Sequence, residues 1–141
     1  MFERFTKRVK ELLEAAGKEA QKFGNNRIEP EHILLAMIME GKGIGVAILN
    51  HMGVDLNKLK FDIERNMKIG IPVHIGELPL SPESKRVLEK AIAEAQFHGH
   101  AYIGTEHILL GILSSEETVP SKILRSRGIT LGNSRQLIND F

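Results

Sequence analysis

The sequence predicts an all-α fold made of two tandem four-helix repeats that pack with pseudo-twofold symmetry. Three observations lead to this prediction. Apolar residues recur every three to four positions, as expected for helices with one buried face. Glycines and N-capping residues divide this pattern into short segments. The second half of the chain also repeats the first at an offset of about 75 residues, with about 19 of roughly 61 aligned positions identical.

The first repeat, about residues 1–68, is expected to hold four helices. Thr6 is a good N-cap for the first helix, because its side chain can accept a hydrogen bond from a free backbone N–H of the first turn. Gly24 then provides the left-handed residue that ends this helix. The other three helices are expected at about residues 31–40, 44–52 and 56–68.

About residues 69–80 form a linker between the repeats. They contain two prolines and two glycines, so no helix is expected there. Their apolar side chains predict that the linker lies against the helices. Ser81 and Pro82 then place an N-cap before a proline at the first helical position, which opens the second repeat at about residues 81–141.

The composition is that of one ordinary globular domain, so residues 1–141 are expected to fold as a unit. The chain contains no cysteine, which excludes disulfides, thiolate metal sites and a cysteine nucleophile. Its net charge of +1 gives no reason to expect binding to nucleic acid or to a membrane surface. No signal peptide is recognisable, and no apolar run reaches the roughly 20 residues of a membrane span. We therefore expect a cytoplasmic protein whose isolated domain is monomeric.

A Glu-His pair recurs at the start of the second helix of each repeat, as Glu31-His32 and Glu106-His107. Each histidine stands beside a single carboxylate and is expected to pack against a neighbouring helix. For the glutamates two roles stay open, helix capping or binding of a guanidinium group. The zinc-protease string His-Glu-x-x-His is absent, and the two histidines at 98–100 straddle a predicted helix end, so no metal site is expected.

No motif for catalysis stands out, and the chain is not expected to be an enzyme. The nucleophile elbow Gly-x-Ser-x-Gly is absent, and Ser81, four residues before Lys85, already has a role as a helix cap. The phosphate-binding loop Gly-x-x-x-x-Gly-Lys-Ser/Thr is absent as well, so the chain is not itself an ATP-hydrolysing module. No cofactor is expected in this domain.

Two strings of residues resemble a known family. Residues 24–35 are Gly-Asn-Asn-Arg-Ile-Glu-Pro-Glu-His-Ile-Leu-Leu, and residues 104–111 are Gly-Thr-Glu-His-Ile-Leu-Leu-Gly. With Phe5-Thr6 at the start of the first helix, they closely resemble the Clp N-terminal repeat domain, and most of all the ClpC branch of the AAA+ unfoldases. The resemblance covers nearly the whole chain and agrees with the all-α prediction.

This resemblance implies a substrate- and adaptor-binding domain of an ATP-dependent unfoldase. Such domains sit on a hexameric ATPase ring, bind adaptor proteins, and receive protein substrates for unfolding and delivery to a ClpP-type peptidase. ATP and Mg²⁺ are then expected in the ATPase modules of a parent protein. The alternative is a stand-alone adaptor or regulator without an ATPase of its own.

In the ClpC branch each repeat offers a pocket for phosphorylated arginine, a mark for degradation. A phosphate can be held by N–H groups at a helix N-terminus, and a glutamate can pair with the guanidinium. The resemblance assigns these roles to Thr6 and Glu31 in the first repeat and to Ser81, Thr105 and Glu106 in the second. To these we add Lys10 and Lys85, which are identical across the repeats, as auxiliary positive charges.

The first repeat departs from the family pattern, because it has Glu29-Pro30-Glu31 where Gly-Thr-Glu is common. Pro30 lacks a hydroxyl and a backbone N–H. Glu29 adds a negative charge that repels phosphate. We therefore expect the first pocket to bind phosphoarginine more weakly than the second or to prefer another ligand, and a role in adaptor docking alone stays open.

Overall fold

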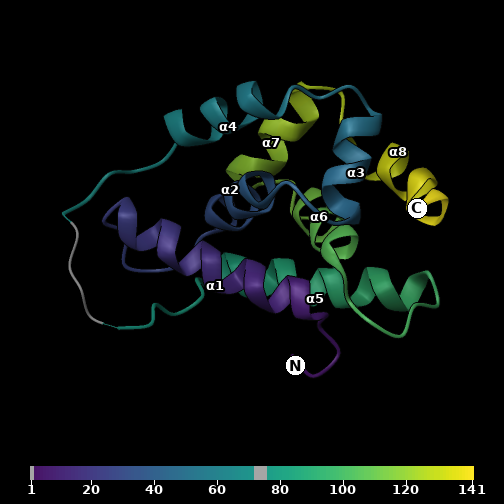
Figure 1. Cartoon of the computed structure of the whole chain (residues 1–141), viewed down its shortest axis with the longest axis horizontal. Coiled ribbons are helices and arrows are strands. Elements are labelled where there is room, and N and C mark those ends of the chain that lie inside the picture. Colours follow the sequence, from purple (N-terminus) through teal and green to yellow (C-terminus); the bar gives the residue numbers. More distant parts are fainter. Residues whose placement is uncertain (1, 72–75) are drawn as a thin grey trace.

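The computed structural model describes residues 2–71 and 76–141. Within these ranges the chain forms α-helices, one short 3-10 helix and no β-strand, which confirms the all-α prediction (Figure 1). The elements are α1 (Lys7–Lys22), α2 (Pro30–Glu40), α3 (Ile44–His51), α4 (Leu56–Arg65), α5 (Pro82–Phe97), α6 (Thr105–Ser114), α7 (Val119–Ser126), α8 (Leu131–Leu137) and the 3-10 helix Ile138–Asp140.

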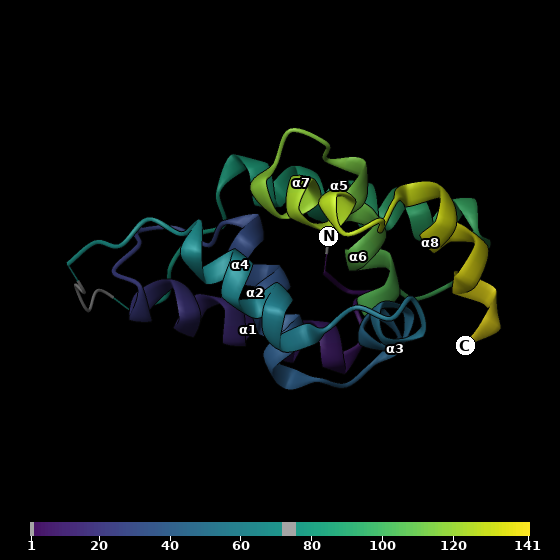
Figure 2. The ribbon, with the colours of Figure 1, turned by 90° about the horizontal axis from the view of Figure 1, so that it is seen from above.

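Helices α2 and α6, the second helix of each repeat, lie at the centre of the molecule (Figure 2), with α1 and α5 on one side and α4 and α7 on the other (Figure 1). All residues from His32 to Ile38 in α2 are buried, and so are those from His107 to Leu113 in α6. A helix that is surrounded by other helices needs no polar face. This explains why both segments are apolar in almost every position.

The two predicted N-caps at the starts of α1 and α5 are confirmed. The Thr6 hydroxyl accepts a hydrogen bond of 3.2 Å from the backbone N–H of Val9. The Ser81 hydroxyl accepts one of 3.0 Å from the backbone N–H of Ser84. Each cap satisfies one of the N–H groups that a helix leaves free in its first turn.

The two repeats are interlocked. Helix α3 packs mainly on α6, which belongs to the other repeat, and α7 contacts α2 as well as α6. Two isolated parallel β-bridges also cross between the repeats. There, the backbone N–H of Thr6 donates to the carbonyl of Ile103 (3.1 Å), and that of Ser81 donates to Ile28 (3.0 Å). The first helix of each repeat therefore begins beside the start of the second helix of the other repeat.

The end of the first repeat differs from the prediction. Helix α4 ends at Arg65, three residues before the predicted end, because the chain then turns towards the end of α1. The backbone N–H of Gly70 donates to the carbonyl of Phe23 (2.8 Å), and the side-chain amide of Asn25 donates to Lys68 (2.8 Å). These bonds replace the hydrogen bonds that another helical turn would have made.

The linker packs against the helices in one part only. Leu78 and Leu80 lie against the core, as predicted. Ile69 and Ile71 are 82% and 84% exposed, so the prediction is wrong for them. Residues 72–75 of the linker lie outside the described ranges.

Among the described helices, none alone is long and apolar enough to cross a membrane. Helices α2 and α3 meet that criterion only when they are taken together, and they are bent by 82° relative to each other.

Candidate functional site

A cavity of about 610 Å³ lies where the N-termini of α1, α3 and α6 meet, and we call it the α6 cavity. Thr6 caps α1, Gly43 precedes α3, and Gly104 precedes α6. Free backbone N–H groups give each helix N-terminus a partial positive charge, so three of them around one cavity favour an anion. The cavity is lined by Thr6, Arg8, Gly43, Ile44, Gly99, His100, Ala101, Tyr102, Gly104, Thr105, Glu106, His107, Ile138, Asn139 and Phe141.

Thr105 joins two of these helix starts. Its side chain is 4% exposed, and its hydroxyl accepts a hydrogen bond of 2.9 Å from the backbone N–H of Gly45. Gly43 lies between the same segments with a φ of 94°, and a Cβ atom there would stand 2.8 Å from both Arg8 Cδ and Thr105 Oγ1. Only glycine fits at this position, because both the backbone conformation and the close neighbours exclude a side chain.

Two charged side chains of opposite sign complete the α6 cavity. Arg8 comes from α1, where its Nη1 atom lies 2.9 Å from the carboxylate of Glu40. Glu106 comes from the first turn of α6, and its carboxylate folds back over Gly104, where a Cβ atom would clash with it. The cavity therefore presents both a cation and an anion, which suits a ligand that carries both charges.

A buried histidine anchors the start of α6. The backbone N–H of Gly104 donates to Nδ1 of His107 (2.9 Å), and Nε2 of His107 lies 2.8 Å from Nδ1 of His100. Burial, with smaller contributions from positive charge at His100 and His98, lowers the pKa of His107 to about 4. The ring is therefore neutral near pH 7 and acts as part of the helix cap, in line with the structural role expected for it.

The cavity at the start of α2, the equivalent helix of the first repeat, is lined by more acidic residues than the α6 cavity. A cavity of about 470 Å³, which we call the α2 cavity, lies at the N-terminus of α2. Burial raises the pKa of Glu31 there, the charges of Glu29 and Glu83 raise it further, and Lys68 opposes them. The charged residues that line this cavity are Arg27, Glu29, Glu31, Lys68, Glu83 and Glu117.

The cavities combine residues that the sequence interpretation assigned to separate repeats. Thr6 was expected beside Glu31, but it lines the α6 cavity with Thr105 and Glu106. Ser81 was expected beside Glu106, but it begins α5, and the α5 residue Glu83 lines the α2 cavity with Glu31. The cause is the interlocking of the repeats, because of which each cavity is lined by residues from both repeats.

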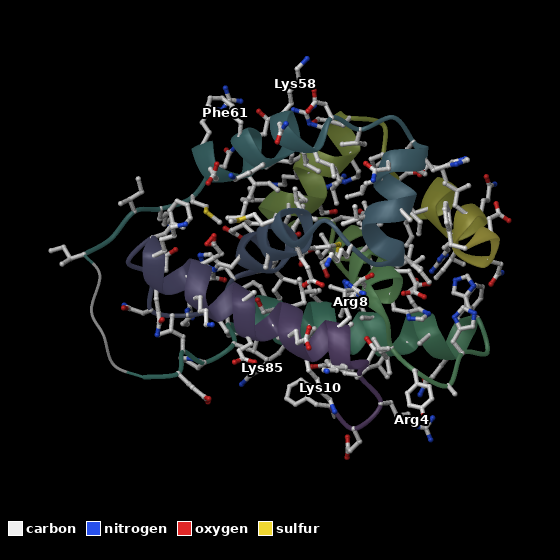
Figure 3. The ribbon with its side chains drawn as sticks, viewed as in Figure 1. Arg4, Arg8, Lys10, Lys58, Phe61 and Lys85 are labelled. Atoms are coloured by element: carbon white, nitrogen blue, oxygen red, sulfur yellow. The ribbon has the colours of Figure 1, made fainter. Side chains whose placement is uncertain are left out.

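Ser81 and the two auxiliary lysines do not line the α6 cavity. Ser81 is 0% exposed, and its hydroxyl is occupied by the cap of α5. Lys10 instead lines an apolar groove of about 700 Å³ between α1 and residues 76–80. Lys85 is exposed, and Figure 3 shows it near Lys10, while Arg8 projects from the opposite side of α1. Lys10 and Lys85 therefore lie outside the lining of this cavity, and their auxiliary role stays a prediction.

Arg8 lines the α6 cavity but is not among the site residues predicted from the sequence. A comparison of the repeats contains a signal for it. The position equivalent to Arg8 in the second repeat is Glu83. Arg8, in the first turn of α1, lines the α6 cavity, and Glu83, in the first turn of α5, lines the α2 cavity. The two cavities thus differ by a charge reversal at matched positions.

Within the ranges that the structure covers, no group of three His, Cys, Asp or Glu side chains is arranged to hold a metal ion. His98 lies 3.6 Å from Glu94, but that carboxylate is already paired with Arg135.

Comparisons with known proteins agree with this architecture. Residues 4–127 match the Clp repeat (R) N-terminal domain family. The chain is 40% identical to the chloroplastic chaperone protein ClpC1 of Oryza sativa subsp. japonica over 135 residues, which cover 96% of this chain and 15% of that protein. The chain therefore spans about 15% of the length of this relative.

Solved structures show the same fold at low sequence identity. The Hsp104 N-terminal domain from Candida albicans superposes with a TM-score of 0.78 at 20% identity, covering 95% of this chain and 88% of that one. A ClpV N-domain in complex with a VipB peptide gives a TM-score of 0.76 at 16% identity, with 95% and 84% covered.

Proposed function

The chain belongs to the Clp repeat (R) N-terminal domain family, and we propose that it docks adaptor proteins and protein substrates onto a Clp-type ATP-dependent unfoldase. Support comes from the similarity to the N-terminal part of the chaperone ClpC1. The ClpV N-domain of the same fold was solved with a VipB peptide bound, which gives a precedent for peptide docking.

The parent protein and its setting are part of this proposal. ATP and Mg²⁺ act in its ATPase modules, and a ClpP-type peptidase degrades the unfolded substrates. The cytoplasmic location stays a prediction, since a similar relative is chloroplastic. The proposed role of the domain itself is binding.

For the α6 cavity we propose phosphorylated arginine as the ligand. Phosphoarginine joins an anionic phosphoryl group directly to a guanidinium, so its site needs an anion-binding region beside a carboxylate. One observation carries the proposal: three helix N-termini, Arg8 and Glu106 all line the same cavity. The helix starts and Arg8 hold the phosphoryl group, and Glu106 accepts the guanidinium N–H donors.

The α2 cavity lacks this combination of an anion-binding region and a carboxylate. Its matched position carries Glu83 in place of Arg8, and Pro30 and Glu29 stand where α6 has Thr105 and Gly104. Proline cannot donate an N–H, and the extra carboxylates repel a phosphoryl group. These differences support the prediction that phosphoarginine binds the first repeat more weakly.

The test is a calorimetric titration of the protein with phosphoarginine. We expect the wild-type protein to bind. Glu106→Ala is expected to lose at least about tenfold in affinity, because it removes one charge-assisted hydrogen-bonded pair with the guanidinium. Glu31→Ala, the matched change in the other repeat, is expected to leave the affinity nearly unchanged.

Two ligand controls define the chemistry. Arginine lacks the phosphoryl group and phosphoserine lacks the guanidinium, so both are expected to bind much more weakly than phosphoarginine. A wild-type protein that does not bind phosphoarginine would remove this part of the proposal, and equal losses in Glu31→Ala and Glu106→Ala would contradict the assignment to the α6 cavity.

A further inference from the structure

Three histidines connect the end of α5 with the start of α6. The rings of His98 and His100 are stacked with centroids 5.7 Å apart. Nδ1 of His100 lies 2.8 Å from Nε2 of His107, and Nδ1 of His107 accepts from the backbone N–H of Gly104 at 2.9 Å. The backbone position of Gly104 therefore depends on the ring of His107. The position of that ring depends in turn on His100.

The directions of these hydrogen bonds fix the proton positions. Because Nδ1 of His107 accepts the N–H of Gly104, the neutral His107 ring carries its proton on Nε2. That proton is donated to Nδ1 of His100, which has to be unprotonated. A proton added to His100 occupies Nδ1, so the two rings then face each other with one N–H each, and the hydrogen bond is lost.

In the first repeat, His32 anchors the start of α2 in the same way, but its hydrogen-bond partner does not change with pH. The backbone N–H of Glu29 donates to Nδ1 of His32 (2.8 Å), and Nε2 of His32 lies 2.7 Å from Oδ1 of Asn25. Asn25 is the residue equivalent to His100. An amide oxygen accepts a hydrogen bond at any pH, whereas a histidine nitrogen ceases to accept when it is protonated.

We propose that His100 is a proton-sensitive positioning residue, which holds the start of α6 through His107 at neutral pH and releases it when it takes up a proton. Histidine is the side chain whose charge ordinarily changes between about pH 5 and 8. Burial lowers the pKa of His107 to about 4, so His107 stays neutral over that range. The release is confined to the second repeat, because Asn25 does not titrate.

The charges around His100 come from several helices. On the side of α5 and α8, Glu94 lies 3.6 Å from Nε2 of His98 and is paired with Arg135. The ring of His98 stacks on that of His100, and two positive charges at this separation would repel each other. The remaining titratable side chains of the cavity are Arg8 from α1, Tyr102, and Glu106 and His107 from α6.

Amide hydrogen exchange followed by NMR tests the proposal in the protein without any ligand. We expect the protection factor of the Gly104 N–H to fall about fivefold between pH 7.5 and 5.5, which corresponds to about 1 kcal/mol for one hydrogen bond. The Glu29 N–H is the internal reference for any general loss of stability on acidification, and the fivefold fall at Gly104 is expected relative to it.

Two substitutions that copy the first repeat separate the roles of the rings. His100→Asn restores an acceptor for His107, so the protection of the Gly104 N–H relative to that of Glu29 is expected to be the same at both pH values. His98→Phe copies Phe23, and the fivefold fall is expected to remain. An unchanged Gly104 protection factor in the wild type, the same fall in His100→Asn, or an equal fall at Glu29 would overturn the proposal. None of these outcomes depends on whether phosphoarginine binds.

Discussion

The hydroxyl of Thr105 accepts a hydrogen bond of 2.9 Å from the backbone N–H of Gly45, although the two residues belong to different repeats. The bond ties the N-terminus of α3 to that of α6. Both residues are buried, so water cannot replace Thr105 as a partner for the Gly45 N–H. The α6 cavity is thus held together across the boundary between the repeats.

We predict that Thr105→Val destabilises the protein by about 1–3 kcal/mol, because the change keeps the shape of the side chain but leaves the Gly45 N–H buried without a partner. Urea unfolding measures the free energy of unfolding. Thr105→Ser keeps the hydroxyl and is expected to lose less. Equal stability of Thr105→Val and the wild type would show that this bond does not hold the repeats together.

A second prediction concerns Gly43. Gly43→Ala places a side chain at a φ of 94° and against Arg8 and Thr105, so we expect a loss of more than about 2 kcal/mol in the free energy of unfolding. Gly53 has a φ of 76°, and a Cβ atom added there would meet no other atom within 4 Å. Gly53→Ala therefore isolates the backbone strain and is expected to cost about 1 kcal/mol. A Gly43→Ala protein as stable as Gly53→Ala would contradict the close packing at the cavity.

A third prediction concerns Glu94, which is 5% exposed and pairs with Arg135 through two guanidinium nitrogens. Arg135→Met leaves this carboxylate without its partner. Because Arg135 is itself 39% exposed, we expect a loss of about 1–2 kcal/mol, which is below the roughly 3–5 kcal/mol typical of a fully buried pair. Thermal and urea unfolding measure the loss.

The matched control is Glu19, the equivalent of Glu94, whose partner Lys22 lies 3.9 Å away and is 69% exposed. Lys22→Met is expected to change the stability by no more than about 0.5 kcal/mol. If Lys22→Met lowered the free energy of unfolding as much as Arg135→Met, the prediction that the Glu94–Arg135 pair stabilises the fold more than an exposed pair would be contradicted.

The fourth prediction is a pH dependence of stability. Burial lowers the pKa values of His32 and His107 to about 4 in the folded protein, below the ordinary value of about 6.5 in the unfolded chain. Between these values the unfolded chain binds more protons, so acidification favours unfolding. The free energy of unfolding is expected to fall by about 1 kcal/mol per histidine between pH 7 and 5.5.

Glu31 acts in the opposite direction, because burial raises its pKa and its protonation on acidification favours the folded state. Glu31→Gln removes this contribution, so the stability of that variant is expected to fall somewhat more steeply than that of the wild type. A free energy of unfolding that is constant or rises from pH 7 to 5.5 would contradict the buried, neutral state of the two histidines.

The sequence was sufficient to predict most helices, because their signals are local. Thr6, Ser81 and Pro82 mark helix starts by their own chemistry, and the repeat transfers each assignment from one half to the other. The end of α4 was predicted too late, because it depends on bonds that join Gly70 and Lys68 to the end of α1, which is distant in the sequence.

The composition of the site was predictable only in part. Thr6, Thr105 and Glu106 line the α6 cavity as individual residues, but their spacing does not reveal which helix starts meet. That depends on how the repeats interlock. Identity across the repeats favoured Lys10 over Arg8, whereas the side of α1 that faces the cavity is set by packing.

The most direct test of the composite phosphoarginine site is an NMR titration that follows the backbone amides while phosphoarginine is added. We predict that amides at the starts of α1, α3 and α6, near Thr6, Gly43 and Glu106, shift together with a single dissociation constant, while those near Glu31 shift only at much higher concentration. Shifts confined to one helix start, equal shifts near Glu31, or no shifts at all would contradict this account.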